Sequence, residues 1–381
     1  MKAIGLMSGT SMDGIDVALI ETDGEGVHSF GPACAYPYSA AERHLLREAM
    51  VSARGLKARD TRGGVLALAE SMVTSKHADC VTAFAEANGI RLSSIDAVGF
   101  HGQTVLHRPE QQLTVQLGDG GRLSAAIGVP VVYDFRAADM ESGGQGAPLV
   151  PVFHRALALR AGLPLPAAFV NIGGISNVTF VPEGPAEGLI AFDAGPGNCL
   201  IDDWALRYTD EPMDRDARLA MAGTVDRQTL ASLIAHPFFR EPPPKSLDRG
   251  AFTLDMIGDL SPEDGAATLT AFTVAGIAAA AHLLPERPRV WIVAGGGARN
   301  PHMFEGLRRV LGANTVTADE AGFSADFMEA QAFAYLAVRR LKELPSTFAG
   351  TTGVSEPAVG GLVADANARQ PSPVNAEVLG A

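Results

Sequence analysis

The sequence predicts an α/β protein with two domains, each built on a mixed sheet. The chain has 381 residues, which is more than one ordinary hydrophobic core accommodates. Strand-like and helix-like segments alternate in both halves, and each half contains a glycine-rich strand–turn–strand, at residues 4–21 and 167–181. We expect the boundary in the glycine cluster within residues 135–150, which gives domains of residues 1–138 and 139–381.

The first half is predicted to begin with two strands, because apolar side chains alternate after the turn at Ile15, Val17 and Leu19. The elements expected next are helices over 41–56 and 64–88, a buried strand over 94–105 that ends in a polar glycine turn, and a similar strand over 129–140 with Asp134 and Arg136 at its carboxyl end.

The elements expected in the second half are the hairpin over 167–181, a short strand over 189–192, a helix capped by Asn198, a buried alanine-rich helix within 271–284, and a strand that leads through three glycines to a helix capped by Asn300. The alanine-rich stretch is too short to span a bilayer. The segment from residue 345 onward is rich in Gly, Pro and Thr, so we expect extended surface structure that can pack back on the first domain.

Composition and charge narrow the classes of partner. Apolar residues make up 47% of the chain and charged residues 19%, which is typical of a folded globular protein. The formal net charge of −13 argues against duplex nucleic acid as the main partner, because phosphate neutralisation needs clustered Lys and Arg. A small anionic ligand is still compatible, since backbone N–H groups and a metal ion can hold phosphate.

The cysteines and the N-terminus favour a cytoplasmic protein. Cys34, Cys80 and Cys199 are few, odd in number and far apart, which indicates a reducing compartment and no structural zinc. Polar residues such as Ser8 and Asp13 interrupt any apolar region of a signal peptide. We therefore expect no membrane association.

The first turn, "SGTSMDG" at residues 8–14, has the chemistry of a phosphate site. It is neither a P-loop nor a Rossmann turn, because the required lysine and glycine spacings are missing. Gly9 and Gly14 allow close approach, consecutive N–H groups form an anion-binding concavity, and Asp13 and Asp16 offer oxygen ligands for Mg²⁺. The alternative is a plain hairpin turn, although such turns use two to five residues and this one uses about seven.

Two further glycine turns favour a nucleotide-binding site. Gly173 and Gly174 form a second small-residue hairpin, which alone is a weak signal but together with the first suggests two turns facing one polyphosphate. The triple glycine at 295–297 removes side chains where a flat base or a ribose could lie against the backbone.

Asp193 is the candidate general base. We expect it at the carboxyl end of a short strand, where a carboxylate can be aimed into a cleft. The alternative is an aspartate that only caps the following helix. Asp202 and Asp203 are expected to be ordinary helix-face residues.

Four polar residues are candidates for substrate contact. His101 and Gln103 follow a glycine-containing strand and suit a polyhydroxylated ligand, although a lone His is more often structural. Arg136 presents a fork of donors for a carboxylate. Glu329 follows the cap residue Ser324, and its alternative role is to compensate the helix macrodipole. Lys245 lies in the proline-rich loop 242–250, where its role stays open.

Taken together, these stretches resemble the anhydro-N-acetylmuramic acid kinase family. The blocks that carry the resemblance cover nearly the whole chain in order: "GLMSGTSMDGID", "GFHGQTV", "DFR", "GGQGAPLVP", "NIGGISN", "FDAGPGN", "PPKS", "AGGGARN" and "ME..AFA". Leu247 and Asp248 depart from the Thr-Gly that more often follows "PPKS", and Ala217 stands where a Gly is usual. These departures concern local loop contacts.

The resemblance implies the acetate and sugar kinase/Hsp70/actin superfamily, with two ribonuclease H-like (actin-like ATPase) domains around an ATP cleft. The residues that it places at the nucleotide are Gly9, Thr10, Ser11, Met12, Asp13, Gly14, Ile15 and Asp16 in the first phosphate loop, Gly173 and Gly174 in the second, and Gly295, Gly296, Gly297 and Asn300 near the adenosine. It makes Asp193 the catalytic base, and it places His101, Gln103, Arg136 and Glu329 around the sugar.

The implied reaction uses ATP and Mg²⁺. Asp193 takes a proton from a water that attacks C1 of 1,6-anhydro-N-acetylmuramic acid, the bridge opens, and O6 accepts the γ-phosphate. The products are N-acetylmuramic acid 6-phosphate and ADP, and the implied role is recycling of cell-wall fragments by a cytoplasmic homodimer. The metal ligands are not assigned.

Other readings of the same motifs predict other products. Another sugar or acid kinase of this fold would share the ATP turns and differ only in the sugar pocket. A nucleotide-dependent binding protein would turn over ATP without a phosphorylated small molecule. A dinucleotide-dependent oxidoreductase is disfavoured by the glycine pattern.

Overall fold

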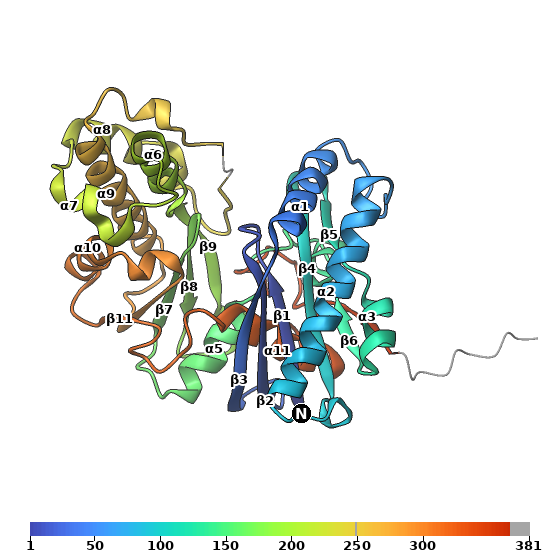
Figure 1. Ribbon diagram of the computed structural model, residues 1–381. Helices are drawn as coiled ribbons and strands as arrows, with labels where there is room; N and C mark the ends of the chain where they lie inside the picture. The colour runs from blue at the N-terminus through green and yellow to red at the C-terminus, as the bar shows by residue number, and fades with distance from the viewer. Residues whose placement is uncertain (248–249, 366–381) are drawn as a thin grey trace, which may run out of the picture.

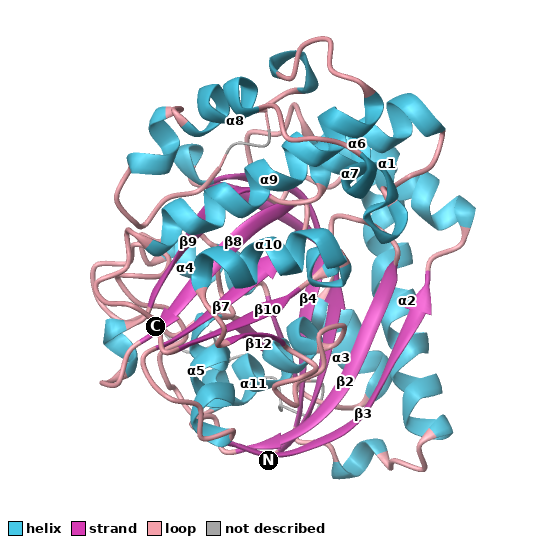
Figure 2. Ribbon diagram, turned by 90° about the vertical axis from the view of Figure 1, so that its left-hand side faces the viewer, coloured by secondary structure: helices cyan, strands magenta, loops and turns pink. Residues whose placement is uncertain are grey.

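The computed structural model describes residues 1–247 and 250–365, which form two sheets with helices around them (Figures 1 and 2). The strands are β1 (Lys2–Ser8), β2 (Gly14–Thr22), β3 (Val27–Pro37), β4 (Ala97–Arg108), β5 (Leu113–Leu117), β6 (Val131–Tyr133), β7 (Ala167–Ile172), β8 (Ile175–Val181), β9 (Ile190–Pro196), β10 (Val290–Ala294), β11 (Thr315–Thr317) and β12 (Leu362–Ala364).

The α-helices are α1 (Ala40–Ala53), α2 (Val65–Ala87), α3 (Gly120–Ile127), α4 (Phe135–Glu141), α5 (Pro151–Arg160), α6 (Cys199–Thr209), α7 (Arg218–Ala222), α8 (Arg227–Ile234), α9 (Pro262–Ala281), α10 (Pro301–Leu311) and α11 (Met328–Leu341). The 3₁₀ turns are η1 (Leu92–Ser94), η2 (Pro109–Gln111), η3 (Ala186–Gly188), η4 (Arg215–Ala217), η5 (Pro237–Arg240), η6 (Leu254–Met256) and η7 (Gly296–Arg299).

The two sheets share one topology. The first has the order β12-β6-β4-β1-β2-β3, with β5 paired to β4, and the second has the order β11-β10-β7-β8-β9. In each, the first strand is antiparallel to the second and parallel to the fourth in the order of the chain. The expected α/β fold class, with two ribonuclease H-like units and mixed sheets, is confirmed. The domain boundary stays a prediction, and α11 and β12 from the end of the described chain lie with the first sheet.

Helices α5 and α11 lie where the two halves meet (Figure 1). One hydrophobic cluster contains residues of both sheets and of both helices, among them Ala3, Phe153, Phe169 and Phe333. The halves are therefore joined by a continuous apolar core and not only by a linker.

Helix α11 lies directly on the first sheet. A Cβ at Gly5 would overlap the carbonyl oxygen of Ala330, and a Cβ at Gly99 would overlap that of Phe333. Only glycine allows the helix backbone to approach β1 and β4 this closely. This approach carries the N-terminal turn of α11, with Glu329, to the carboxyl end of the first sheet.

Helix α9 is the expected alanine-rich helix. By length and hydropathy it could span a membrane, but 67% of its apolar window is buried inside the protein. This burial is typical of a core helix, and Phe272 in α9 packs against Phe239 and Phe252.

Two sequence-based strand predictions were wrong in their ends. The strand expected over 94–105 does not end in a glycine turn. Strand β4 bulges at Gly102, since Leu6 pairs with Phe100 but Ser8 pairs with Gln103, and then continues to Arg108. The expected strand over 129–140 ends at Tyr133. Asp134 then adopts φ 57°, and α4 begins.

These two corrections matter for the site. A β-bulge changes the direction of the side chains that follow it. Arg136 lies in the first turn of a helix instead of at a strand end, because the left-handed residue before it turns the chain.

We predict that Gly99→Ala lowers the free energy of unfolding by about 1–3 kcal/mol or more, because the new methyl group must push α11 off the sheet. Urea unfolding measures the change. Gly184→Ala, where a Cβ meets nothing within 4 Å, is the control and should unfold like the parent chain. Equal stabilities for Gly99→Ala and the parent would contradict the close packing.

Candidate active site

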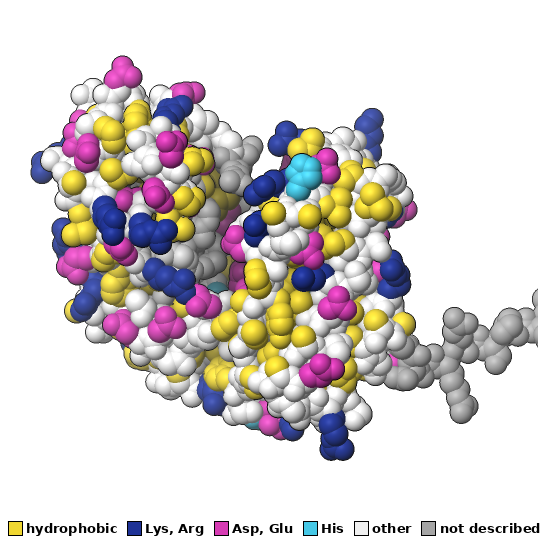
Figure 3. All heavy atoms as spheres, viewed as in Figure 1, with side chains coloured by type: hydrophobic (Ala, Val, Ile, Leu, Met, Phe, Trp, Pro, Cys, Tyr) yellow, Lys and Arg dark blue, Asp and Glu magenta, His cyan; other side chains and the backbone are white. Residues whose placement is uncertain are grey.

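The surface is hollowed between the two halves (Figure 3). The turn between β1 and β2 and the turn between β7 and β8 occupy equivalent positions in the two sheets, because each joins the first and second strands of its sheet. Repetition of the fold thus presents two glycine turns, as the sequence predicted.

The first turn is held in place by Gln103. Its Nε2 donates to the carbonyl oxygen of Gly9 at 3.0 Å, and its Oε1 accepts from Ser8 Oγ at 2.6 Å. Met12 N also donates to Gly9 O, and Met12 has φ 58°. Gln103 is fully buried and supports the loop. Its expected contact with the sugar stays a prediction.

The glycines of the turns fall into two groups. Those with ordinary φ and room for a Cβ are Gly9, Gly173, Gly174 and Gly296. Gly14, Gly295 and Gly297 are required by the protein's own packing; at Gly297, for example, a Cβ would overlap Ile172. Packing does not explain the first group, so the space beside these backbones is available to another molecule.

The second turn is tied to the start of α6. Asn198 N donates to Gly173 O at 2.8 Å, and Gly197 N donates to Gly174 O at 2.9 Å. The prediction that the Asn198 side chain caps α6 was wrong, because its Nδ2 donates to Ile172 O at 3.1 Å. The residue fixes the turn to strand β7 instead.

The third turn behaves as expected at its helix. Asn300 Oδ1 accepts from Met303 N at 2.9 Å and caps α10. Gly295 has φ 79°, and η7 follows it directly. Gly296 therefore presents an open backbone between strand β10 and the capped helix.

Asp193 lies in the middle of β9, not at its end as predicted. The pairing with β8 shifts beside it, since Asn177 faces Asp193 whereas Ser176 faces Gly195. One carboxylate oxygen, Oδ2, accepts from Leu247 N at 2.8 Å. Burial raises the pKa of Asp193 to about 6, and the Leu247 N–H and the Lys245 ammonium oppose this rise.

Several carboxylates gather below the first turn. Burial, and then the charges of Glu329, Asp326 and Asp13, together raise the pKa of Asp16 to about 6. Asp326 also pairs with Arg299 of η7, which links the second half to the segment before α11. The arrangement concentrates negative charge that a cation could neutralise.

Glu329 lies in the first turn of α11, as predicted. Ser324 does not cap α11 itself, because its Oγ accepts from Phe327 N, one residue before the helix begins. Part of the Glu329 side chain faces solvent, yet the surrounding protein removes enough hydration to raise its pKa, against the opposing charge of Arg136.

Half-buried Arg136 pairs with buried His101. Arg136 Nη2 donates to His101 Nε2 at 3.1 Å, and Arg136 Nη1 donates to Gly146 O at 2.9 Å. Burial, and then the Arg136 charge, lower the pKa of His101 to about 3, so the ring is neutral and its Nδ1–H donates to Gly102 O. Arg136 Nε is buried without a partner among the described residues.

Asp139 is a buried residue whose role sequence reasoning did not find. Its carboxylate accepts from Gly146 N and from Thr352 Oγ1, both at 2.7 Å. Because Gly146 O in turn binds Arg136, Asp139 fixes the loop that holds the arginine. The one signal in the sequence was the spacing of Asp139, three residues after Arg136 in one helix.

A contact joins this loop to the loop that holds Asp193. Ser246 Oγ donates to Gln145 Oε1 at 3.1 Å, and Gln145 N donates to Thr352 O at 2.8 Å. The loop next to Arg136 and the loop next to Asp193 therefore meet across the two halves.

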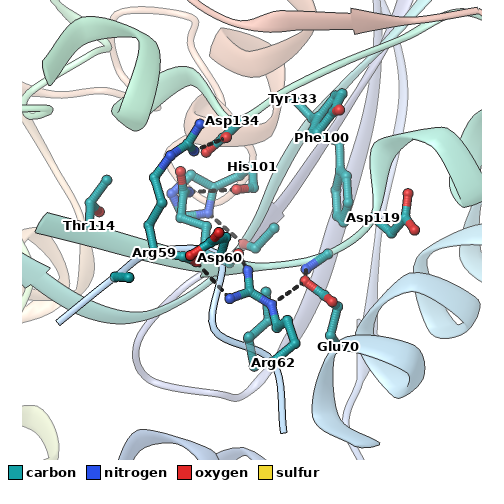
Figure 4. Close-up of a pocket in the computed structure, with 15 residues that line it drawn as sticks. Arg59, Asp60, Arg62, Glu70, Phe100, His101, Thr114, Asp119, Tyr133 and Asp134 are labelled. Atoms are coloured by element: carbon teal, nitrogen blue, oxygen red, sulfur yellow. Dashed lines mark hydrogen bonds and ion pairs between the residues drawn. The ribbon is translucent and has the colours of Figure 1, made fainter. Parts of the chain in front are cut away.

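A polar cavity of about 670 Å³ opens beside His101 (Figure 4). Arg59 pairs there with Asp134, and Arg62 Nε pairs with Glu70 at 2.7 Å. Sequence reasoning did not single out these arginines, because they lie in a loop between two helices without a recognisable motif.

The fold and the site together define a class. Two repeated α/β units with paired glycine turns and a half-buried carboxylate of raised pKa are the arrangement expected of a phosphotransferase.

Comparison with known proteins gives the family. A family model described as Anhydro-N-acetylmuramic acid kinase matches residues 1–366. Relatives named Anhydro-N-acetylmuramic acid kinase include those of Nitrobacter winogradskyi, 59% identical over 95% of this chain and 99% of the relative, and of Bradyrhizobium diazoefficiens, 54% identical over 96% and 99%. The chain therefore belongs to the anhydro-N-acetylmuramic acid kinase family, and the resemblance found in its sequence is confirmed.

Solved structures are more distant. Component A of (R)-2-hydroxyglutaryl-CoA dehydratase from Acidaminococcus fermentans is similar over 90% of this chain and 99% of its own, at 12% identity and a TM-score of 0.47. A ROK family glucokinase from Streptomyces griseus is similar over 88% and 99%, at 16% identity and a TM-score of 0.36. At these values the likeness carries no weight for function.

We predict that His101→Gln reduces the loss of stability in acid. The folded pKa of His101, about 3, lies below its ordinary 6.5, so the stability present above pH 6.5 is lost as the pH falls below that value. Gln keeps an acceptor for Arg136 but takes up no proton. Between pH 7 and pH 5 the variant should therefore lose about 2 kcal/mol less free energy of unfolding, measured by urea titration.

His44→Gln is the control, because 72% of that side chain is exposed and its replacement should leave the acid loss unchanged. An acid loss in His101→Gln equal to that of the parent chain would show that the ring is not held neutral.

Proposed function

We propose that this protein is an ATP-dependent kinase that opens the 1,6-anhydro bridge of 1,6-anhydro-N-acetylmuramic acid with water and phosphorylates O6. The products are N-acetylmuramic acid 6-phosphate and ADP. Family membership supports the reaction. The observation that carries the mechanism is Asp193, half-buried in β9 with one carboxylate oxygen held by Leu247 N.

Asp193 acts as the general base. Its Oδ2 is bonded, and Oδ1 has no hydrogen bond to a residue that the structure describes, so Oδ1 can accept a proton from water. A pKa of about 6 suits this task, because the carboxylate is mostly ionised near neutral pH yet is a stronger base than an ordinary aspartate.

The chemistry balances in one site. The water oxygen bonds to C1 as its proton passes to Asp193, and the C1–O6 bond breaks. O6 keeps the electron pair of that bond and attacks the γ-phosphorus of ATP, from which ADP leaves. The protein's contribution is positioning and the stabilisation of charge.

The glycine turns hold the nucleotide. Residues 9–16 and the turn at 173–174 bind the phosphates through backbone N–H groups, and residues 295–297 with Asn300 lie at the adenosine. The open space at Gly9, Gly173, Gly174 and Gly296 supports this assignment, because a ligand that contacts the backbone needs that space.

Mg²⁺ fits the negative charge below the first turn. Among the described residues no three His, Cys, Asp or Glu side chains are placed to hold a metal on their own. Asp16 and Asp13 would therefore share the ion with water and phosphate oxygens, and the ion would neutralise phosphate charge.

Arg136 recognises the lactyl carboxylate of the sugar. Its Nε has no partner among the described residues, and His101 and Gly146 fix the plane of the guanidinium. Glu329 and His101 border the same sugar site. A cytoplasmic homodimer that recycles cell-wall fragments is the cellular setting that we propose.

The deciding experiment is mass spectrometry of the product made from ATP, the anhydro sugar and ¹⁸O-labelled water. We expect label on C1 and phosphate on O6. Asp193→Asn should bind ATP normally while kcat falls by about 10²–10⁴, because the amide accepts no proton. Label absent from C1, or near-normal turnover by Asp193→Asn, would refute the mechanism.

We predict that Gly173→Ala leaves the unfolding transition unchanged but raises KM for ATP by about tenfold, or ~1.4 kcal/mol, because the methyl group enters space open in the protein alone. Initial rates at varied ATP measure KM. Gly184→Ala should alter neither quantity, and an unchanged KM in Gly173→Ala would remove this turn from the nucleotide site.

A further inference from the structure

A buried ammonium lies on the loop that holds Asp193. Lys245 is 8% exposed, and its Nζ donates to Phe238 O at 2.5 Å. The Nζ also lies 4.3 Å from the ring centroid of Phe238 and 5.7 Å from that of Phe192. Two aromatic faces and one carbonyl oxygen therefore surround this charge, and Phe192 directly precedes Asp193.

The backbone around Lys245 clamps the same aspartate. Asp193 N donates to Lys245 O at 3.0 Å, and Leu247 N donates to Asp193 Oδ2 at 2.8 Å. The backbone and the carboxylate of Asp193 are thus both held by the loop that carries the ammonium. A substitution at Lys245 therefore affects Asp193 in two ways: through the position of the loop and through the electric field of the ammonium.

The ammonium has no ion-pair partner within 4 Å among the described residues. Among the described residues, two carboxylates act on its charge: Glu241 from the segment after η5 and Asp193 from β9. Burial lowers the pKa of Lys245, and both carboxylates oppose this effect. Charges interact more strongly across a dry interior than in water. The field of Lys245 therefore acts on Asp193 without a direct contact that would block the carboxylate.

A buried charge is not the most stable way to fill the pocket between Phe192 and Phe238. Removing an ammonium from water is costly, and it takes the contacts with the aromatic rings and the hydrogen bond to a carbonyl to offset that cost. A methionine would fill the same apolar pocket without that cost. The charge therefore needs an explanation beyond packing.

We propose that Lys245 is a positioning residue for the reaction: its ammonium keeps the Asp193 carboxylate ionised, and its loop orients that carboxylate toward the attacking water. The inference rests on the proposed role of Asp193 as the base. Lys245 acts through Asp193 and transfers no proton itself.

The test is the pH profile of kcat/KM for the anhydro sugar between pH 5 and 9. In Lys245→Met the acid limb should move upward by about one pH unit, because the field that favours the ionised carboxylate is gone. At pH 6 the rate should fall about fivefold and at pH 8 it should recover, since a one-unit shift changes the ionised fraction from about one half to one tenth only near the pKa. Lys245→Arg keeps the charge and should restore the parent profile.

Lys245→Gln is a second neutral variant in case Lys245→Met fails to fold, because its amide can donate to Phe238 O. Its acid limb should move like that of Lys245→Met. Lys76→Met is the matched control: it removes an ammonium that pairs with Glu42 at 3.3 Å between α1 and α2, and it should leave the profile unchanged.

The outcomes separate the two proposals. If Asp193→Asn abolishes turnover but the acid limb of Lys245→Gln stays where it is and the rate falls equally at every pH, Lys245 only supports the loop and the inference is wrong. If Asp193→Asn turns over normally, the base role and the inference fall together. An acid limb shifted in both neutral variants and restored in Lys245→Arg establishes the role.

Discussion

The close approach of α11 to β1 and β4 is the constraint on which the site depends. Gly5 and Gly99 let the helix backbone rest on the sheet, so a helix from the end of the described chain completes the first half. This places Glu329 beside Asp16 and packs the Phe333 ring against His101, with ring centroids 4.7 Å apart and the planes tilted by 54°. Elements distant in sequence thereby share one rigid support beneath the candidate site.

Repetition of the sheet topology explains why the glycine turns come in pairs. Each hairpin joins the first two strands of its sheet, so two copies of one fold present two equivalent turns. Their supports differ, however. Gln103 from β4 holds the first turn, whereas Asn198 before α6 holds the second. The backbone plan is repeated, and the side chains that stiffen it are specific to each half.

Sequence patterns predicted the elements better than their ends. Alternation and glycine turns located the hairpins and the triple glycine, because these signals are local. The ends of β4, β6 and β9 were missed, since a bulge at Gly102, a left-handed Asp134 and a mid-strand Asp193 depend on pairing with distant strands. The contacts of Asp139 with Thr352 and of the Lys245 loop with Asp193 could not be predicted for the same reason, because these partners lie far away in sequence.

Within the candidate site, Asp16 and Asp193 both have a pKa near 6, but for different reasons. Asp16 is surrounded by other carboxylates, so a bound cation relieves the repulsion and restores its ionised form. Asp193 has no carboxylate among the causes of its shift; burial raises its pKa, and a lysine and an N–H lower it. Because no neighbouring carboxylate contributes to this shift, the surroundings of Asp193 offer no second carboxylate to share a cation, and the group can accept a proton. We therefore propose, from the environment of each side chain and not from its residue type, that Asp16 serves the metal and phosphates and Asp193 the attacking water.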